Sequence, residues 1–281
     1  MGPRIVSLAA IFVVVAGMPL PAPEPAYRNS IGMEFVLIKP GKFTLGKFQP
    51  TYAKPDPGTP VPTPGRARGE SPPTAEEYKR IEEAALRDYR NGFEVAIERP
   101  YYLGKYEVTQ VQYRRVTGTN PSMFQGDKIA DAADPHPVDS VTWADAQAFI
   151  RKLNALENTN VYRLPTEFEW EYAARAGADD DIAWPDIRRQ AFNSGQTTQA
   201  VGRMQPNAWG LYDMLGNVWE WVQDFYNEKI FADPVPPRSG KEHVLKGGGF
   251  LADVKNLTYM WHGAGPGSTF DVGFRIVRDI R

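Results

Sequence analysis

The sequence predicts a loop-rich fold in which short strands and few long helices are joined by many turns. The chain of 281 residues contains 25 Gly and 25 Pro, which are the residues that favour turns and irregular segments. Its hydrophobic content is 42%, so the chain has enough apolar side chains to build a sizeable core. A chain of this length forms either one large domain or two small ones.

Composition excludes several kinds of function. The formal charge of -2 and the pI near 6.0 argue against nucleic acid or an anionic membrane as a main partner. The chain contains no Cys. Disulfides, thiol nucleophiles, thiolate metal sites and a lipid-modified cysteine at the mature N-terminus are therefore excluded.

Residues 1–22 have the features of a secretory signal peptide. Arg4 gives a positive start, Ile5 to Val15 is an apolar run, and Ala16 and Gly17 supply small residues near a cleavage point. The run is short for a membrane span, and an uncleaved anchor is the alternative. Such an anchor would be the protein's only contact with a membrane. We therefore expect an exported protein, periplasmic or extracellular.

Residues 23–30 form a Pro-rich tether, and the predicted domain covers residues 31–281. Ile31 to Gly46 indicates two strands in a hairpin about a Pro40-Gly41 turn. Residues 48–91 are treated as an insertion, which consists of a Pro-rich loop followed by a helix over Thr74 to Arg90. We expect this insertion either to pack on the domain or to dock a protein partner.

Three further helices are predicted. The first covers Thr109 to Val116. The second is capped by Thr142 and runs to about Glu157, and the third is capped by Thr166 and ends at Gly177. On the third helix, Phe168, Tyr172 and Ala173 are expected to share one face, with Trp170 to the side. Strands are expected over Phe93 to Val108, from His243, and over Val272 to Arg278.

One stretch, Asn207 to Tyr226, has an unusual density of aromatic residues, which indicates buried surface. Asp213 and Glu220 flank Gly216 and Val218 in this stretch. Carboxylates and backbone carbonyls on a short turn are the hard oxygen donors that Ca²⁺ selects. The alternative is that Asp213 caps a turn and that Glu220 pairs with an Arg.

Several motifs, in order, resemble the sulfatase-modifying-factor family, whose best-known member is the formylglycine-generating enzyme. They are Gly32-Met-Glu-Phe-Val, Tyr106-Glu-Val-Thr, Pro137-Val-Asp-Ser-Val-Thr-Trp, Arg163 to Arg175, Asn207 to Trp221, Lys246-Gly-Gly-Gly-Phe and Gly273-Phe-Arg-Ile-Val. The resemblance covers most of residues 31–278 outside the insertion. It implies a compact α+β fold related to the C-type lectin fold, with little regular secondary structure.

The resemblance also implies metal ligands. Family members bind Ca²⁺ through an Asn or Asp side chain, two backbone carbonyls and a Glu. These fall on Asp213, Gly216, Val218 and Glu220. A second family Ca²⁺ site corresponds to Asn193 and Ser194, but the acidic loop that completes it is shortened here, so we expect that site to be lost or incomplete.

The departure from the family concerns catalysis. The family oxidase holds copper with two Cys, and the matching positions here are Ala252 and Leu257. Neither side chain can coordinate Cu(I) as a thiolate does. We predict no copper site and no copper-dependent formation of formylglycine.

The segment from Asp253 to Phe270 lies where the family forms its substrate groove. Its ligand-binding candidates are Tyr259, Trp261 and His262, and the alternative is a strand with alternate residues buried. Lys246 and Arg275 either supply charge to this groove or pair with core carboxylates.

Two functions follow from these observations. The favoured one is an exported, non-catalytic binding or structural subunit on the family scaffold, stabilised by one Ca²⁺. The alternative is an extracytoplasmic enzyme of altered chemistry, such as a cysteine-independent maturation factor of the same family.

Overall fold

The computed structural model describes residues 27–45, 76, 79–80, 92–129, 135–179, 182, 184–193, 195–232, 234–252, 257–265, 267 and 269–280. The predicted signal peptide, residues 23–26 of the tether and most of the insertion lie outside this part of the chain. Three residues of the predicted helix over Thr74 to Arg90 are described, and all three are helical. Within the described ranges, no helix is both long and apolar enough to cross a membrane.

The larger sheet has five strands in the order β1-β2-β5-β13-β6. They are β1 (Tyr27–Arg28), β2 (Glu34–Ile38), β5 (Tyr101–Gly104), β13 (Val277–Asp279) and β6 (Tyr162–Arg163). Every neighbouring pair is antiparallel.

The predicted hairpin about Pro40-Gly41 is wrong, although both of its strands exist. The second strand, β3 (Gly41–Leu45), pairs with β4 (Phe93–Ile97) in a separate two-stranded sheet. The reason is tertiary: Phe43 packs on Tyr172 of the third predicted helix, at 5.7 Å between ring centroids. The chain therefore crosses from one sheet to another at Pro40.

A four-stranded sheet has the order β11-β10-β9-β12. Its strands are β11 (His262–Gly265), β10 (His243–Lys246), β9 (Trp219–Phe225) and β12 (Val272–Gly273). The predicted final strand over Val272 to Arg278 is therefore divided between β12 and β13, which belong to different sheets. Phe274, Arg275 and Ile276 between them are completely buried. A short parallel pair, β7 (Ala191–Phe192) with β8 (Leu215–Gly216), completes the strands.

The predicted helix caps at Thr142 and Thr166 are confirmed. The helices are α2 (Gln110–Thr117), α3 (Trp143–Leu156) and α4 (Glu167–Arg175), and each begins with a capping box, at Thr109, Thr142 and Thr166 respectively; the box at Thr109 was not predicted. After α4 the left-handed residue Ala176 precedes Gly177. A short helix that the sequence did not predict, α5 (Trp184–Gln190), and a 3₁₀ turn, η1 (Gly126–Lys128), are also present.

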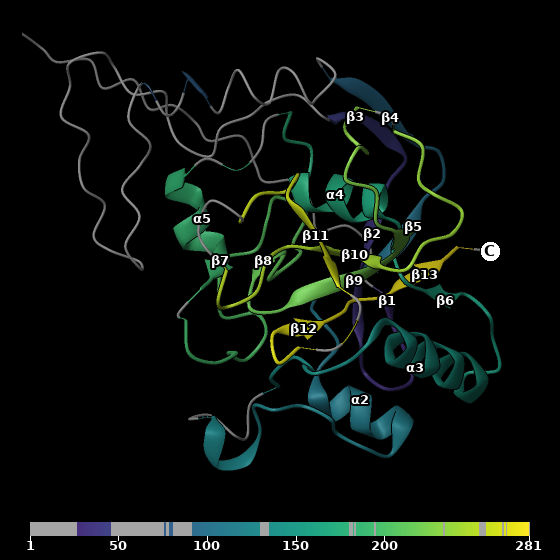
Figure 1. The fold of residues 1–281 in the computed structure, drawn as a ribbon. Coiled ribbons are helices and arrows are strands. Elements are labelled where there is room, and N and C mark those ends of the chain that lie inside the picture. Colours follow the sequence, from purple (N-terminus) through teal and green to yellow (C-terminus); the bar gives the residue numbers. More distant parts are fainter. Residues whose placement is uncertain are drawn as a thin grey trace, which may run out of the picture.

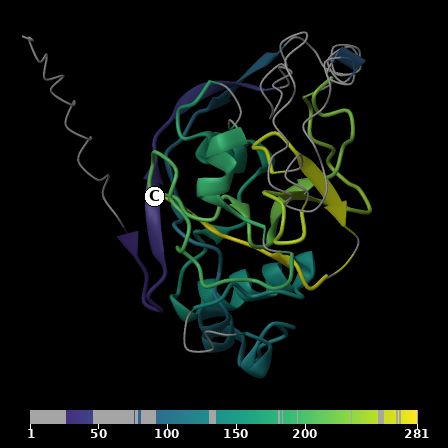
Figure 2. The ribbon, with the colours of Figure 1, turned by 90° about the vertical axis from the view of Figure 1, so that its left-hand side faces the viewer.

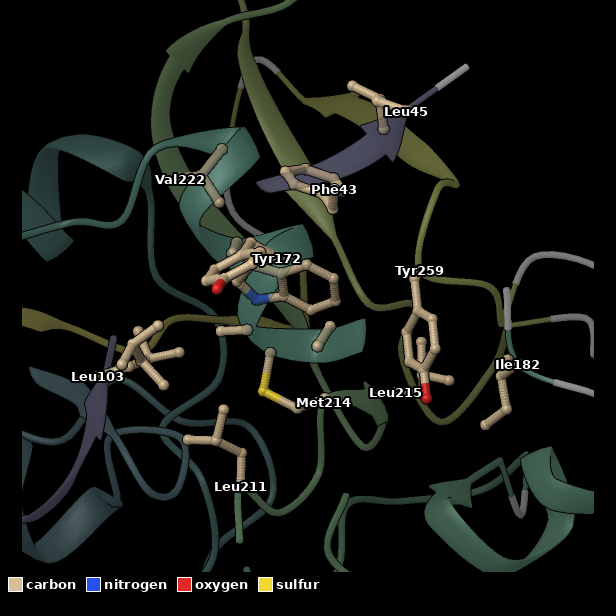
Figure 3. Packing of buried hydrophobic residues seen from close by; sticks show 14 of the residues in the cluster. Phe43, Leu45, Leu103, Tyr172, Ile182, Leu211, Met214, Leu215, Val222 and Tyr259 are labelled. Atoms are coloured by element: carbon tan, nitrogen blue, oxygen red, sulfur yellow. The ribbon is translucent and has the colours of Figure 1, made fainter. Parts of the chain in front are cut away.

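Two hydrophobic clusters form the core. One surrounds α4 and includes Phe43, Tyr172 and Met214, as Figure 3 shows. The other joins α2 and α3 to the five-stranded sheet. Trp170, expected at the side of its helix, is completely buried. In Figures 1 and 2, α2 and α3 lie together at the end of the molecule opposite β3 and β4.

Candidate functional site

A row of polar side chains crosses the four-stranded sheet next to α4. Glu220 of β9, Lys246 of β10 and His262 of β11 are direct register partners, so their side chains lie on one face. Helix α4 supplies a hydrogen-bond partner to each of them: Trp170 to Glu220, Glu171 to Lys246 and Glu167 to His262. This row places ionisable groups in the interior, which is costly unless each is paired.

Glu220 is paired with Arg275. The guanidinium donates from Nε to Oε2 at 2.7 Å and from Nη2 to Oε1 at 2.6 Å. The indole Nε1 of Trp170 donates to Oε2 at 2.7 Å. Both charged side chains are buried, with exposed fractions of 0% and 1%. Of the two roles predicted for Arg275 from the sequence, the structure therefore shows the second, pairing with a core carboxylate.

Two more carboxyl groups face the same guanidinium. Glu107 accepts hydrogen bonds from Asn217 Nδ2 at 2.7 Å and from the backbone N of Val218 at 3.2 Å. Burial raises the pKa of Glu107 well above its ordinary value, and the nearby Asp213 and Glu220 raise it further. Burial is also the main reason that the pKa of Asp213 rises to about 6. Arg275 opposes both shifts.

The predicted calcium ligands fit a cation in part. Asp213 Oδ2 accepts from the backbone N of Gly202 at 2.6 Å, while the buried Oδ1 has no hydrogen-bond partner among the described residues. Asp213, Gly216 and Asn217 are left-handed, with φ of 52°, 80° and 56°. An open carboxylate oxygen on such a turn suits Ca²⁺. Glu220, in contrast, would have to share its oxygens with Arg275.

No group of three or more His, Cys, Asp or Glu side chains in the described part of the chain is arranged to hold a metal. The predicted calcium set has only two acidic side chains and two backbone carbonyls, so it is not a group of this kind. Of the second site, Asn193 is half-buried directly after β7, and Ser194 lies outside the described residues. Both metal assignments stay predictions.

Lys246 also pairs with a core carboxylate. Its Nζ donates to Glu171 Oε2 and to the carbonyl of Met260, both at 3.1 Å. Arg175 donates to the other oxygen of Glu171 from Nε and Nη2, at 3.0 and 2.7 Å. Glu171 and Lys246 are completely buried, and Arg175 is nearly so. One carboxylate therefore pairs with two cations inside the domain.

The remaining ligand-binding candidates have different environments. His262 Nδ1 lies 2.9 Å from Glu167 Oε1. The centroid of its ring lies 4.9 Å from the ring centroids of both Tyr226 and Phe231. Trp261 is 44% exposed, whereas Tyr259 is buried in the core. These two residues precede β11 rather than forming a strand themselves. Their role in binding a ligand stays a prediction.

The two positions matched to the copper cysteines carry hydrocarbon in contact with the core. Leu257 is completely buried in the cluster around α4, and Ala252 packs against that cluster. Sequence reasoning assigned no role to Glu107 or Glu171. Both lie in motifs shared with the family, but periodicity alone does not distinguish an acidic residue inside a buried segment from one at the surface.

Comparison with known proteins agrees with this arrangement. The Sulfatase-modifying factor enzyme 1-like domain matches residues 21–280. The chain belongs to the sulfatase-modifying-factor family and has the α+β, C-type-lectin-like fold of the formylglycine-generating enzyme. The predicted family and fold class are confirmed.

Similar proteins include the "Chaperone protein LppX" of Paenibacillus barcinonensis, which is 30% identical over 240 residues, covering 63% of this chain and 80% of LppX. The formylglycine-generating enzyme of Streptomyces coelicolor is 36% identical over 140 residues, 41% of this chain and 42% of that enzyme. The match thus spans less than half of the enzyme's length. Among solved structures, Treponema denticola variable protein 1 has a TM-score of 0.67 at 23% identity, covering 91% of this chain and 99% of that one.

Proposed function

We propose that this protein is an exported, non-catalytic binding subunit on the formylglycine-generating-enzyme scaffold. The observation that carries the proposal is the hydrocarbon at both copper positions, Ala252 and the completely buried Leu257. Copper chemistry of the family type requires two soft thiolate ligands, and the chain has no Cys at all. What is left is a scaffold that can present loops to a partner.

The partner we propose is a polypeptide in the cell envelope. Support comes from LppX, whose name is that of a chaperone and which this chain matches over 80% of LppX. The exposed Trp261 next to β11 supplies an aromatic side chain of the kind enriched in protein interfaces. We propose that the insertion at 48–91 contributes to the same contact.

A turnover assay tests the non-catalytic part of the proposal. The chain from residue 23 onward would be loaded with Cu(I) and given a sulfatase-type Cys peptide and O₂, with the Streptomyces coelicolor enzyme as the positive control. We expect no aldehyde above the level of a no-protein blank. Aldehyde formation that scales with protein concentration would overturn the proposal and favour the enzyme alternative.

A pull-down from the native envelope tests the binding part. The insertion can be excised with little strain, because Leu45 and Phe93 at its two sides are direct register partners in the β3–β4 pair. Replacing residues 46–92 with an Asn-Gly turn therefore closes a hairpin. The control replaces residues 48–91 with a Gly-Ser segment of the same length. We expect both variants to lose a partner that the natural chain retains.

Recovery of the same partner by both variants would remove the insertion from the proposal. Failure of the natural chain to retain any stoichiometric partner would count against a binding subunit altogether. Circular dichroism of the hairpin variant checks that its fold is intact.

We also propose that Asp213, the carbonyls of Gly216 and Val218, and Glu220 hold one Ca²⁺. The support is the buried Oδ1 of Asp213, which lacks a hydrogen-bond partner among the described residues, and three carboxyl groups that face one guanidinium. Bound Ca²⁺ would balance the negative charge of carboxyl groups that a single guanidinium does not balance. Its role would be structural.

Thermal unfolding with Ca²⁺ or with EGTA tests this proposal. Ca²⁺ at about a hundred times its Kd would raise the free energy of unfolding by about 2.7 kcal/mol. Asp213→Ala should abolish the gain, whereas the control Asp127→Ala, at an exposed position, should keep it. Equal stability of the natural chain in Ca²⁺ and EGTA, with no binding heat by calorimetry, would exclude the site.

A further inference from the structure

Four basic residues lie on α2 and α3, whereas α2 has no acidic residue and α3 has only Asp145, in its first turn. Residues 109–126 contain Arg114 and Arg115, and residues 146–156 contain Arg151 and Lys152. Neither stretch contains an Asp or a Glu, although Asp127, Asp145 and Glu157 lie directly at their limits. The chain as a whole has a formal charge of -2, so its charge is locally separated. We call the outer side of these two helices the α2–α3 surface.

The two helices bring these cations together. Tyr113 of α2 stacks on Phe149 of α3, with ring centroids 5.5 Å apart and an interplanar angle of 9°. Lys152 Nζ donates to the carbonyl of Thr117, at the end of α2, at 3.3 Å. The two helices lie side by side in Figure 1. All four basic residues are exposed, and none forms an ion pair with a carboxylate of the described residues.

The two helices also expose large apolar side chains. Val111 of α2 is 56% exposed and Leu156 of α3 is 59% exposed. They are two of the seven large hydrophobic residues exposed in the described part of the chain. Cations beside exposed apolar side chains are typical of surfaces that sit in the headgroup region of a bilayer.

We propose that the α2–α3 surface docks the protein on an anionic lipid bilayer. Basic residues near such a surface each contribute attraction to its negative potential. Because screening limits the field of the bilayer to about 8 Å, attraction to it depends on the charge of the surface that faces the lipid. The net charge of the whole chain matters much less.

A purely structural explanation covers only part of the pattern. Arg114, Arg115 and Lys152 lie at the carbonyl end of α2, where cations stabilise a helix. This accounts for neither Arg151, which is within α3, nor the exposed Val111 and Leu156. Attraction to a bilayer accounts for the cations and the apolar side chains together.

The N-terminal end of the described chain lies beside the end of α3, next to the α2–α3 surface. The backbone N and the hydroxyl of Ser30 donate to Glu157 Oε1, at the end of α3, at 3.0 and 2.5 Å. Ser30, which directly precedes the predicted domain, is therefore fixed beside α3. The proposal does not depend on the predicted signal segment, because its test uses a chain without it.

Cosedimentation with vesicles tests the proposal. Residues 23–281 would be mixed with vesicles of phosphatidylcholine, or of phosphatidylcholine with about one third phosphatidylglycerol. Salt would be about 0.05 M or about 0.5 M. The test variant is Arg114→Gln with Arg115→Gln, Arg151→Gln and Lys152→Gln. The control removes four exposed cations elsewhere: Arg99→Gln, Lys229→Gln, Arg238→Gln and Lys241→Gln.

We expect binding to anionic vesicles only, weakened by high salt, and reduced about five-fold for each charge removed from the α2–α3 surface. The control should bind at least ten times more strongly than the test variant. Equal loss in both variants would show an effect of net charge and overturn the proposal. Absence of binding, binding to neutral vesicles, or retention on an acidic protein or RNA without vesicle binding would overturn it too.

Discussion

Arg275 and Glu220 form a bidentate ion pair that is buried from solvent, with N–O distances of 2.7 and 2.6 Å. The same guanidinium donates to the carbonyls of Gly104, Tyr212 and Asp213, at 3.2, 3.0 and 3.0 Å. Arg275 thus connects the end of β5, the loop before β8 and the start of β9. In a fold with short strands, this side chain ties together segments that have few backbone hydrogen bonds to one another.

Removing the guanidinium should therefore be severely destabilising. Arg275→Met leaves Glu220 buried without its partner, with Asp213 and Glu107 nearby. Breaking a buried ion pair in this way costs about 3–5 kcal/mol. Urea unfolding at neutral pH would measure the loss against Arg238→Met, at an exposed position. A loss below about 1 kcal/mol would contradict this structural role of Arg275.

The second buried network predicts an order of effects. Glu171 pairs with both Lys246 and Arg175, so Glu171→Gln removes the carboxylate that these two buried cations share. Lys246→Met leaves Glu171 still paired with Arg175. We expect a cost of about 3–5 kcal/mol for the first change and roughly 1–3 kcal/mol for the second. Denaturant midpoints of the two variants would check this order, and the reverse order would contradict the network.

Asp224 predicts a dependence of stability on pH. Burial, and then the carboxylates of Glu167 and Glu169, raise its pKa from 3.8 to about 6, against a hydrogen bond from the backbone N of Glu167. Since the folded state holds the proton more tightly, this group favours folding most below about pH 4 and loses that contribution as the pH rises to about 6.

Asp224→Asn keeps an oxygen for the Glu167 N–H but cannot ionise. At pH 7 we expect it to be more stable than the natural chain by up to about 3 kcal/mol, the equivalent of the shift in pKa. At pH 4 the two should agree. Urea unfolding across this range would measure the difference, and a gap that does not change with pH would rule out the ionisation of Asp224 as its cause.

The features that the sequence predicted correctly are local. The caps at Thr142 and Thr166 depend on residues three positions apart, so spacing alone identifies them. Strands β2 and β3 pair with distant strands, β5 and β4 respectively. The Pro40-Gly41 turn signal between β2 and β3 therefore led to the wrong pairing. The split between β12 and β13 has a similar origin, because Arg275 must reach Glu220.

The candidate site divides in the same way. The stretch around Asp213 and Glu220 was identified from its residue types, because acidic residues among aromatic ones need partners. Glu107 was missed because its partners Asn217 and Val218 lie more than a hundred residues along the chain. No periodicity in one segment reports a contact of that kind.

Two glycines with nearly equal backbone angles provide a matched test of the turn that holds Asp213. Gly216 has φ of +80° and Gly210 has φ of +84°. A Cβ at Gly216 would lie 2.4 Å from the carbonyl O of Phe192, whereas a Cβ at Gly210 would meet nothing within 4 Å. Both Ala variants carry the cost of a left-handed residue, about 1–2 kcal/mol. Gly216→Ala adds a backbone overlap that no rotamer change relieves, so we expect it to lose at least about 2 kcal/mol more in urea unfolding. Equal losses would show that β7 and β8 separate readily, and that the turn around Asp213 is not held by the Gly216–Phe192 contact.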